Sequence, residues 1–336
     1  MKQLKIMLFA VLALFATLAL AGGAEKRLIV DTAFVAEAMK RGALLWDVRG
    51  AGEYRKGHIP GALNAGDIGK TLRYEHNEDF LPTPQIEKIL GEAGIDLSRE
   101  IVVYGDKGDA YVYFGLFAAQ YFGAGQVYAY HGGIDDWKAA KKEISDDPVK
   151  PVPLALKLKP HPELTVATEE VVSKLSSNVQ IVDARSPREF SGEDIRAIRG
   201  GHIPGAVNIP FQKNWADPDT PAKLAKREVA NKDGMGLKPL DQLKALYAKL
   251  DPEKETIVYC QSGVRAAESA AVLKDLGFKN VKLYDASWLG YANALSTPVE
   301  NATFFNVGQM NGKLDAMQRR IEAMERVLNE IVKAMK

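Results

Sequence analysis

The hexapeptide Gly-His-Ile-Pro-Gly-Ala occurs twice in the sequence, at residues 57–62 and again at residues 201–206. An apolar run that ends in Asp-x-Arg precedes each copy, at residues 44–49 and 180–185. Self-similarity of this kind indicates a duplicated structural unit. The sequence therefore predicts two domains of the same fold, and a length of 336 residues agrees with two.

Each unit also contains two later apolar runs with a helix-like stretch between them. The first of these runs are residues 101–104 and 256–259, and the second are residues 126–129 and 281–284. Short apolar runs between turn residues are typical of strands buried on both faces, and their alternation with helices indicates a parallel sheet. The predicted fold class is α/β, with two domains that each have a mainly parallel sheet flanked by helices.

The N-terminus has the pattern of an export signal. Lys2 and Lys5 form a basic start, residues 6–20 are a continuous apolar run, and residues 19–21 have the Ala-x-Ala cleavage pattern. The run is shorter than the roughly 20 apolar residues of a membrane span. We therefore expect a cleaved signal, no stable membrane anchor and a periplasmic location; an uncleaved anchor is the alternative.

Residues 147–162 are rich in proline and lysine and have no clear periodicity. Prolines cannot continue a helix, so this segment is interpreted as an extended linker between the domains. The predicted organisation is a signal peptide (1–21), an N-terminal domain (22–146), the linker (147–162), a C-terminal domain (163–300) and a C-terminal helix (301–336).

The C-terminal segment has apolar residues at alternating spacings of three and four, which is the heptad seam of a coiled coil. The seam consists of Val307, Met310, Leu314, Met317, Ile321, Met324, Leu328, Ile331 and Met335. Glycines at 308 and 312 weaken its start, so we expect a firm helix from about Leu314. We predict a homo-oligomer formed through this helix; packing on its own domain or binding another protein are the alternatives.

Two further features of this helix bear on its partner. In a parallel arrangement, Arg320 and Glu325 occupy positions that pair between neighbouring helices. Val327 and Val332 add apolar surface beside the seam, which favours more than two helices.

Composition excludes some classes of function. The chain has 44 lysines and arginines against 43 aspartates and glutamates, which gives no electrostatic reason to expect nucleic acid as a partner. Its five histidines and one cysteine have no metal-ligand spacing, so we expect no metal. A single cysteine in an exported protein is either a small buried apolar residue or a reactive thiol, because it has no intrachain disulfide partner.

The surroundings of Cys260 favour the reactive thiol. The sequence Cys260-Gln261-Ser262-Gly263-Val264-Arg265 follows an apolar run and precedes an alanine-rich segment with high helix propensity. A strand, a tight loop and a helix N-terminus together bind anions through converging N–H groups and the helix dipole. We therefore predict that Cys260 reacts as a thiolate.

The other residues of this loop have predicted roles too. The backbone N–H groups of Gln261, Ser262, Gly263, Val264 and Arg265 are expected to bind the negatively charged sulfur. Glycine at 263 allows the backbone to curl, and arginine at 265 supplies positive charge. Phosphatases that use this strand-loop-helix idea have five residues between cysteine and arginine. Four residues form a tighter ring, which suits one sulfur atom and disfavours a phosphatase or arsenate reductase.

With its two Asp-x-Arg strands, two hexapeptides and C-x-x-G-x-R loop, the chain resembles the tandem-domain rhodanese family of thiosulfate and mercaptopyruvate sulfurtransferases over residues 28–295. In that family the N-terminal domain has lost its cysteine. Here Gly105 occupies the position of Cys260, and two acidic residues, Asp106 and Asp109, follow it. The resemblance implies that the first domain is structural and helps to wall the site.

The resemblance also implies a mechanism in two steps without a cofactor. Cys260 takes sulfane sulfur from a small anionic donor as a persulfide, and a thiophilic acceptor, a thiol or cyanide, removes it. Arg185 matches the family position that binds the donor from the domain interface; a salt bridge to Asp183 or Glu189 is the structural alternative.

The thiosulfate enzymes of the family have basic residues after the cysteine, and here neutral Gln261 and Ser262 replace them, as in the mercaptopyruvate enzymes. Arg265, however, adds a charge that suits a doubly charged inorganic donor. Thiosulfate is therefore the favoured donor and 3-mercaptopyruvate the alternative. A hypothesis of another class is a persulfide carrier with little turnover alone. The histidines at 58 and 202 are interpreted as turn residues, and Trp288 as lining either the pocket or the core.

Overall fold

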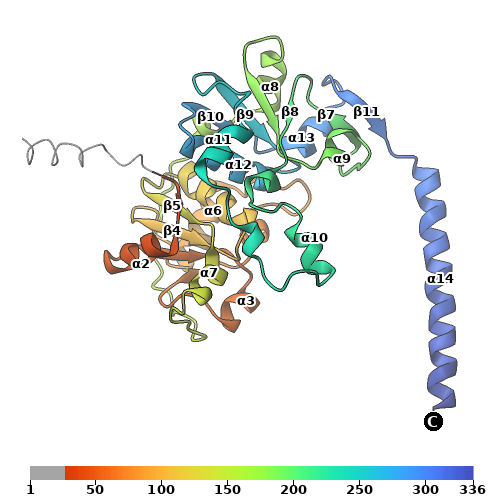
Figure 1. Cartoon of the computed structure of the whole chain (residues 1–336), viewed down its shortest axis with the longest axis horizontal. Coiled ribbons are helices and arrows are strands. Elements are labelled where there is room, and N and C mark those ends of the chain that lie inside the picture. Colours follow the sequence, from red (N-terminus) through yellow and green to blue (C-terminus); the bar gives the residue numbers. More distant parts are fainter. Residues whose placement is uncertain (1–26, 336) are drawn as a thin grey trace, which may run out of the picture.

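The computed structural model describes residues 27–335 as two lobes and a long C-terminal helix that projects from the second lobe (Figure 1). The predicted signal segment, residues 1–21, lies outside the described residues. Within the part described, none of the helices combines the length and the apolar character needed to cross a bilayer.

The first domain has a five-stranded sheet in which all paired strands are parallel, as the sequence predicts. The strand order is β1 (Ile29–Val30), β5 (Val127–Tyr130), β4 (Ile101–Tyr104), β2 (Leu44–Asp47), β3 (Leu63–Asn64). The helices of this domain are α2 (Thr32–Lys40), α3 (Ala51–Lys56), α4 (Ile68–Thr71), α5 (Thr83–Glu92), α6 (Ala110–Tyr121) and α7 (Gly133–Ala139). Strands β2, β4 and β5 are buried along their whole length because helices cover both faces of the sheet.

The second domain repeats this plan with a four-stranded parallel sheet, so the predicted fold class is confirmed. The strand order is β10 (Asn280–Leu283), β9 (Glu255–Tyr259), β6 (Gln180–Asp183), β8 (Val207–Asn208). Its α-helices are α8 (Thr168–Lys174), α9 (Pro187–Phe190), α10 (Thr220–Ala225), α11 (Leu240–Leu246), α12 (Val264–Asp275) and α13 (Ser287–Asn293). Three short 3-10 helices are η1 (Pro162–Leu164), η2 (Phe211–Asn214) and η3 (Asp233–Met235).

The end of the chain differs from the expectation in two respects. A strand, β11 (Glu300–Phe304), pairs antiparallel with β7 (Arg199–His202), where the sequence predicted a helix from residue 301. The helix α14 (Val307–Ala334) then begins seven residues before Leu314, because the Asn306 side chain caps it by accepting the N–H of Gln309 at 2.9 Å. The cap compensates for the glycines in the first turns.

The duplicated residues make the same contacts in both domains. The Nδ1 atom of His58 lies 2.9 Å from the carbonyl oxygen of Tyr54, and that of His202 lies 2.8 Å from the carbonyl oxygen of Phe190. Each imidazole also stacks on the ring of that same residue. Both histidines therefore fix the turn that follows a short helix, as their interpretation as turn residues requires.

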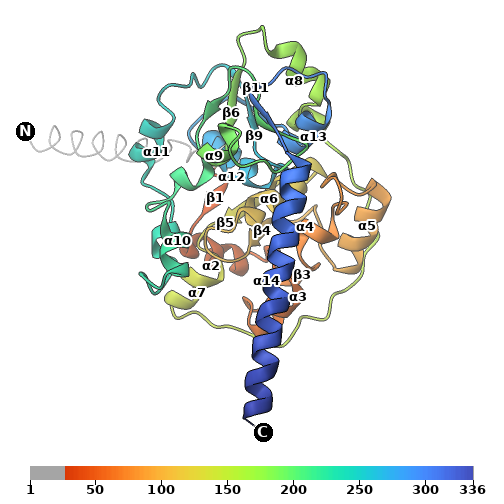
Figure 2. The same ribbon diagram turned by 90° about the vertical axis from the view of Figure 1, so that its right-hand side faces the viewer.

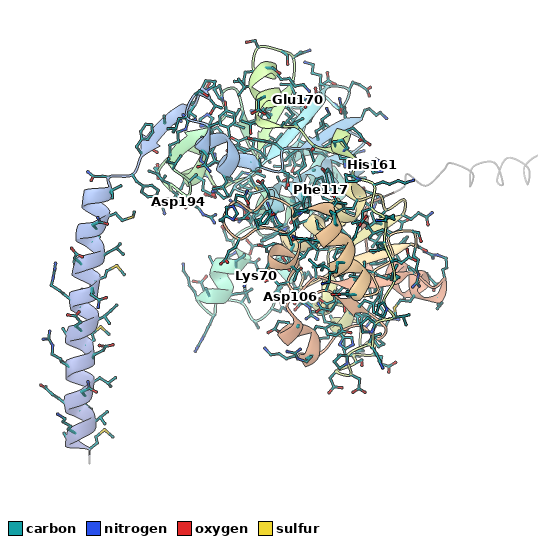
Figure 3. All side chains as sticks on the ribbon, turned by 180° about the vertical axis from the view of Figure 1, so that it is seen from behind. Lys70, Asp106, Phe117, His161, Glu170 and Asp194 are labelled. Atoms are coloured by element: carbon teal, nitrogen blue, oxygen red, sulfur yellow. The ribbon has the colours of Figure 1, made fainter. Side chains whose placement is uncertain are left out.

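The two domains share a continuous hydrophobic core across their interface. Helix α6 of the first domain packs directly on α12 of the second, and Figures 1 and 2 show the two side by side. Phe117 of α6, labelled in Figure 3, lies where the domains meet and shares a small cavity with Ala270 of α12. Because α12 follows the cysteine loop, this packing holds the loop against the first domain.

Residues 147–161 contain no helix or strand and run along the first domain. The N–H of Leu154 donates to the carbonyl of Gly91 at 3.0 Å, and the N–H of His161 donates to that of Tyr121 at 2.7 Å. The connection between the domains is thus held at both of these points.

Candidate active site

Cys260 follows β9 directly, and α12 begins four residues later, so the strand-loop-helix arrangement is present. The cysteine is a free thiol and only 1% exposed. Gly263 has a φ of 85°, and an added Cβ there would lie 2.4 Å from Oδ1 of Asp285. Both the backbone conformation and the lack of space require glycine at this position.

Ser287, a residue outside the predicted site, holds the cysteine loop by hydrogen bonds. Its Oγ accepts the N–H of Cys260 at 3.1 Å and that of Gly263 at 3.0 Å, and it donates to the carbonyl of Tyr284 at 2.7 Å. The Gly263 N–H was expected to bind sulfur, and this hydrogen bond corrects that expectation. Ser287 has a positive φ of 51°, which is a strained conformation for a residue other than glycine.

The N–H groups at the start of α12 are further donors for negative charge. Val264, Arg265 and Ala266 form the first helical turn, whose N–H groups have no carbonyl partner within the helix. Together with the dipole of this twelve-residue helix they favour an anion beside its N-terminus. Cys260 lies at that end of the helix, where a negative charge on its sulfur would be stabilised.

Arg265 is held by a buried carboxylate rather than left free for a donor. Its Nη1 and Nη2 donate to the two carboxylate oxygens of Glu189 at 2.8 and 2.7 Å. Burial opposes the charge of Arg265, but the hydrogen bonds to Glu189 and the charge of Cys260 raise its pKa. Glu189 also completes a capping box with Ser186 at the start of α9.

The charge of Glu189 is likewise fixed by its partners. Burial acts to raise the pKa of its carboxyl, but the Arg265 guanidinium and the Ser186 hydrogen bonds lower that pKa to about 2. Glu189 is therefore ionised at any pH at which the protein works, and it compensates the charge of Arg265. The sequence had suggested Glu189 only as a salt-bridge partner of Arg185.

A side chain of the first domain reaches the loop. Nη2 of Arg73, which follows α4, donates to the carbonyl oxygen of Ser262 at 2.8 Å. Its guanidinium lies 4.7 Å from the centre of the Phe114 ring and 4.0 Å from Oδ1 of Asp285, and the residue is 4% exposed. This contact crosses the domain interface, in agreement with the expectation that the first domain walls the site. Arg73 lies outside the repeated motifs, so no sequence signal pointed to it.

Asp285 is the second carboxyl group beside the loop. Burial raises its pKa to about 6, although the positive charge of Arg73 opposes the rise. Its Oδ1 is enclosed and accepts no hydrogen bond from the described residues. This carboxyl packs against Gly263 and leaves no space there for a side chain.

Arg185 lies within the second domain and is 1% exposed. Its Nη2 bonds to Oδ2 of Asp183 at 2.6 Å and to the carbonyl of Gly201 at 2.8 Å. Arg49 bonds to Asp47 at 2.6 Å and to the equivalent carbonyl at 2.8 Å. The domain without a cysteine has the same arrangement, so the salt bridge of Arg185 to Asp183 has a structural role. Donor binding by Arg185 stays a prediction.

The side chains of one loop residue, Gln261, and of one residue outside the loop, Trp288, also have defined contacts. The Gln261 side chain donates through Nε2 to the carbonyl of Arg196 at 2.7 Å. This hydrogen bond joins the cysteine loop to the segment that follows α9. Trp288 is fully buried, donates to the carbonyl of Arg199 at 3.0 Å, and stacks on Arg185 with its ring centre 4.5 Å from the guanidinium carbon. Trp288 therefore belongs to the core and does not line a pocket.

The corresponding loop of the first domain is filled by a carboxylate of its own. Gly108 has a φ of 73°, so the backbone turns as it does at Gly263. Asp109 caps α6 by accepting the N–H of Tyr111 at 2.9 Å, and its Oδ2 lies 3.1 Å from the place of a Cβ on Gly105. Burial raises the Asp109 pKa to about 6. The negative charge that the helix end attracts is thus already supplied by the protein.

Among residues 27–335, no three histidine, cysteine, aspartate or glutamate side chains are placed together as a metal site would require.

The sequence profile of the Rhodanese-like domain matches the chain twice, at residues 31–140 and 167–294. The chain belongs to the rhodanese family. The thiosulfate sulfurtransferase of Corynebacterium glutamicum is 34% identical to this rhodanese over 262 residues, which cover 74% of this chain and 81% of the relative. That of Azotobacter vinelandii is 32% identical over 262 residues, covering 76% and 90%.

Solved structures agree with this assignment. The 3-mercaptopyruvate sulfotransferase SseA of Escherichia coli superposes on this rhodanese with a TM-score of 0.64 at 27% identity, covering 78% of this chain and 99% of SseA. The anaerobic ergothioneine biosynthesis enzyme of Chlorobium limicola has a TM-score of 0.68 at 23% identity, which shows the shared fold. The relatives support sulfurtransferase activity.

Proposed function

We propose that this rhodanese transfers sulfane sulfur from thiosulfate to a thiophilic acceptor through a persulfide on Cys260. The observation that carries the proposal is the position of this thiol at the N-terminus of α12, in a loop whose shape is fixed by Gly263 and Ser287. Such a site stabilises the negative sulfur that both steps require.

The two steps balance without a cofactor. In the first, the Cys260 thiolate attacks the sulfane sulfur of thiosulfate; the new bond joins the two sulfur atoms, and the S–S bond of thiosulfate breaks with its electron pair leaving on sulfite. In the second, the acceptor attacks the outer sulfur of the persulfide and the thiolate is regenerated. With cyanide the product is thiocyanate; with a thiol it is a new persulfide.

Thiosulfate as the donor is supported by the relatives named thiosulfate sulfurtransferase. The charge of Arg265 is compensated by Glu189, so the loop N–H groups and the dipole of α12 are left as the main attraction for the donor's charge. The alternative donor is 3-mercaptopyruvate, and the alternative function is a persulfide carrier that needs a partner protein for turnover.

The test is an intact mass of the full mature protein after incubation with thiosulfate, under non-reducing conditions, beside a Cys260→Ser variant. We expect a gain of one sulfur atom that cyanide discharges and that the variant lacks. A gain with mercaptopyruvate alone would correct the donor. If the protein gains sulfur but does not turn over with cyanide as a free acceptor, the persulfide-carrier function is favoured. No gain of sulfur with either donor would refute the persulfide.

We propose in addition that the protein is exported to the periplasm. The support is the basic start, the apolar run at residues 6–20 and the Ala-x-Ala pattern that follows. The N-terminal sequence of the protein isolated from its own cells tests the proposal. We expect a start at residue 22 or 23, and an intact Met1 on protein in the cytoplasm would contradict it.

A further inference from the structure

Helix α14 stands apart from both domains. It has 28 residues, which corresponds to a length of about 42 Å, and none of its described side chains is buried (Figures 1 and 2). All nine seam residues, Val307 to Met335, are between 41% and 82% exposed. An isolated stripe of this size marks an interaction surface, because a soluble protein rarely leaves so much contiguous apolar surface in water.

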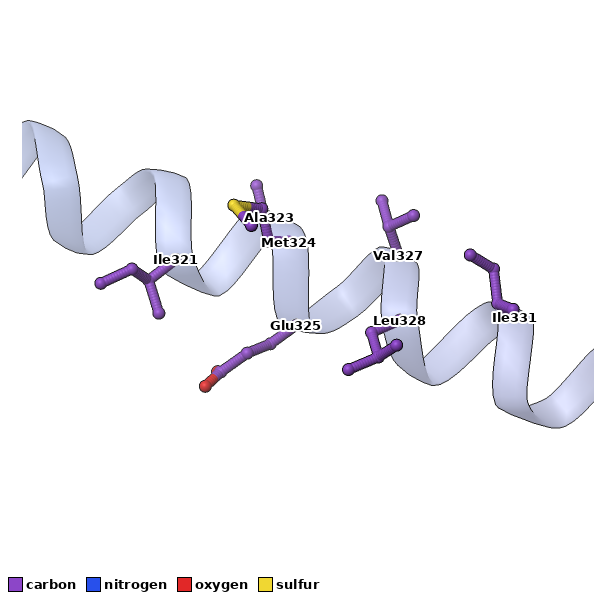
Figure 4. A pocket seen from close by; sticks show the side chains of 7 residues that line it. All are labelled: Ile321, Ala323, Met324, Glu325, Val327, Leu328 and Ile331. Atoms are coloured by element: carbon purple, nitrogen blue, oxygen red, sulfur yellow. The ribbon is translucent and has the colours of Figure 1, made fainter. Parts of the chain in front are cut away.

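The seam has the geometry of a coiled coil rather than of a helix that packs on its own domain. Heptad positions a are occupied by residues 307, 314, 321, 328 and 335, and positions d by residues 310, 317, 324 and 331. Figure 4 shows two neighbouring rows, with Ile321 and Leu328 in one and Met324 and Ile331 in the other. These rows form the two edges of one seam.

We propose that α14 packs against α14 of further copies of this chain in a parallel, in-register bundle of more than two helices. The partner is another copy because the charges beside the seam complement themselves. In a parallel bundle a residue at position g meets position e of the next heptad on the neighbouring helix. Arg320 occupies position g, and Glu325 occupies the e position that it meets.

The opposite orientation brings like charges together. An antiparallel pair places g against g, and the charged g residues, Lys313 and Arg320, are both basic. Like charges held this close are destabilising. The parallel orientation has no such conflict, since the basic g residues face Gln318 and Glu325.

The number of helices follows from the last heptad. Val327 at position g and Val332 at position e are 55% and 45% exposed. A two-stranded seam covers positions a and d, and it leaves these valines largely in water. A third helix covers the flanking positions as well, and leucine at a with isoleucine at d, as at 328 and 331, favours more than two strands. We therefore expect a bundle that widens toward the C-terminus.

Single cysteines test the orientation, because the chain has no cysteine besides the buried Cys260. In a Cys260→Ser background, we expect Leu314→Cys to form a disulfide with its own counterpart under mild oxidation, since in-register a positions approach closely enough for the bond. Arg319→Cys, at the outward position f, is the matched control and should stay monomeric on a denaturing gel. Disulfides only between Leu314→Cys and Ile331→Cys chains would show an antiparallel pair and overturn the proposal.

Light scattering of the full mature protein tests the stoichiometry and the charge pair. We expect a mass above that of a dimer for the wild type and a monomer for Leu328→Glu, which remains able to load sulfur from thiosulfate. Arg320→Glu and Glu325→Arg should each weaken the oligomer, and the double variant should restore it. A monomeric wild type, a dimer, or a double variant no better than the single ones would overturn the proposal.

Discussion

The ion pair between the buried Glu189 and the partly buried Arg265 gives the most specific test of the active-site geometry. Glu189→Gln keeps the shape of the side chain but leaves the partly buried Arg265 guanidinium without its carboxylate partner. Removing one partner of a buried ion pair costs about 3–5 kcal/mol in the free energy of unfolding. We therefore expect this variant to be less stable than the wild type by that amount near neutral pH.

The pH dependence of this difference follows from the Glu189 pKa. The carboxyl has a pKa of about 2 in the folded protein against an ordinary value of 4.5. A lowered pKa contributes stability that is fully present above pH 4.5 and is lost as the pH falls toward 2. At about 1.4 kcal/mol for each pH unit, the contribution is about 3 kcal/mol, of which about 2 kcal/mol is lost at pH 3.

Urea unfolding at pH 7 and pH 3 measures both quantities. The difference between wild type and Glu189→Gln should narrow by about 2 kcal/mol at the lower pH. Glu53→Gln is the matched control, because Glu53 occupies the equivalent place in the first repeat but is exposed and pairs with the exposed Lys56; it should match the wild type at both values. A Glu189→Gln difference that is equal at pH 7 and pH 3 would refute the reasoning.

Substitutions at four further positions distinguish residues that support the loop from residues that bind the donor. Arg73→Met leaves the buried carbonyl of Ser262 without its donor, so it should lower the unfolding free energy by about 1–3 kcal/mol and slow persulfide formation, measured by urea and by intact mass over time; unchanged loading would contradict a role at the loop. Ser287→Ala and Ser287→Gly should both slow loading, with alanine the less stable by about 1 kcal/mol because it keeps the positive φ; equal stability would argue against strain. Arg185→Met and Arg49→Met should destabilise by similar amounts of about 3–5 kcal/mol; a raised KM for thiosulfate in the Arg185 variant alone would show donor binding.

The sequence predicted what is repeated or local. The duplicated strands and the loop after β9 are confirmed, because each depends on residues close together in the chain. The parallel sheets are confirmed because strands that alternate with helices pair in parallel. The position of Ser287 was also open to comparison: it stands three residues after Tyr284, as Gly133 stands three after Tyr130, and both have a φ near 50°. A serine at a position where the other repeat has glycine indicates a role of its side chain in the second domain.

Contacts between segments far apart in the chain could not be predicted from the sequence. Arg73 and Ser262 are 189 residues apart, and their hydrogen bond depends on how α6 packs on α12. Strand β11 contains only five residues and gains its partner from β7, about a hundred residues earlier. Neither contact follows from periodicity, because the docking of whole elements decides both.

The carboxylate of Asp109 makes the loss of the first sulfur site difficult to reverse. Gly105→Cys alone would place the Cβ of the new cysteine 3.1 Å from Oδ2 of Asp109, and two negative groups held so close oppose each other's ionisation. A working thiolate there requires a second change, to an apolar residue such as the valine at the equivalent position 264. A thiolate in the first domain therefore needs at least two substitutions made together, because Gly105→Cys alone gives a thiol whose ionisation Asp109 opposes.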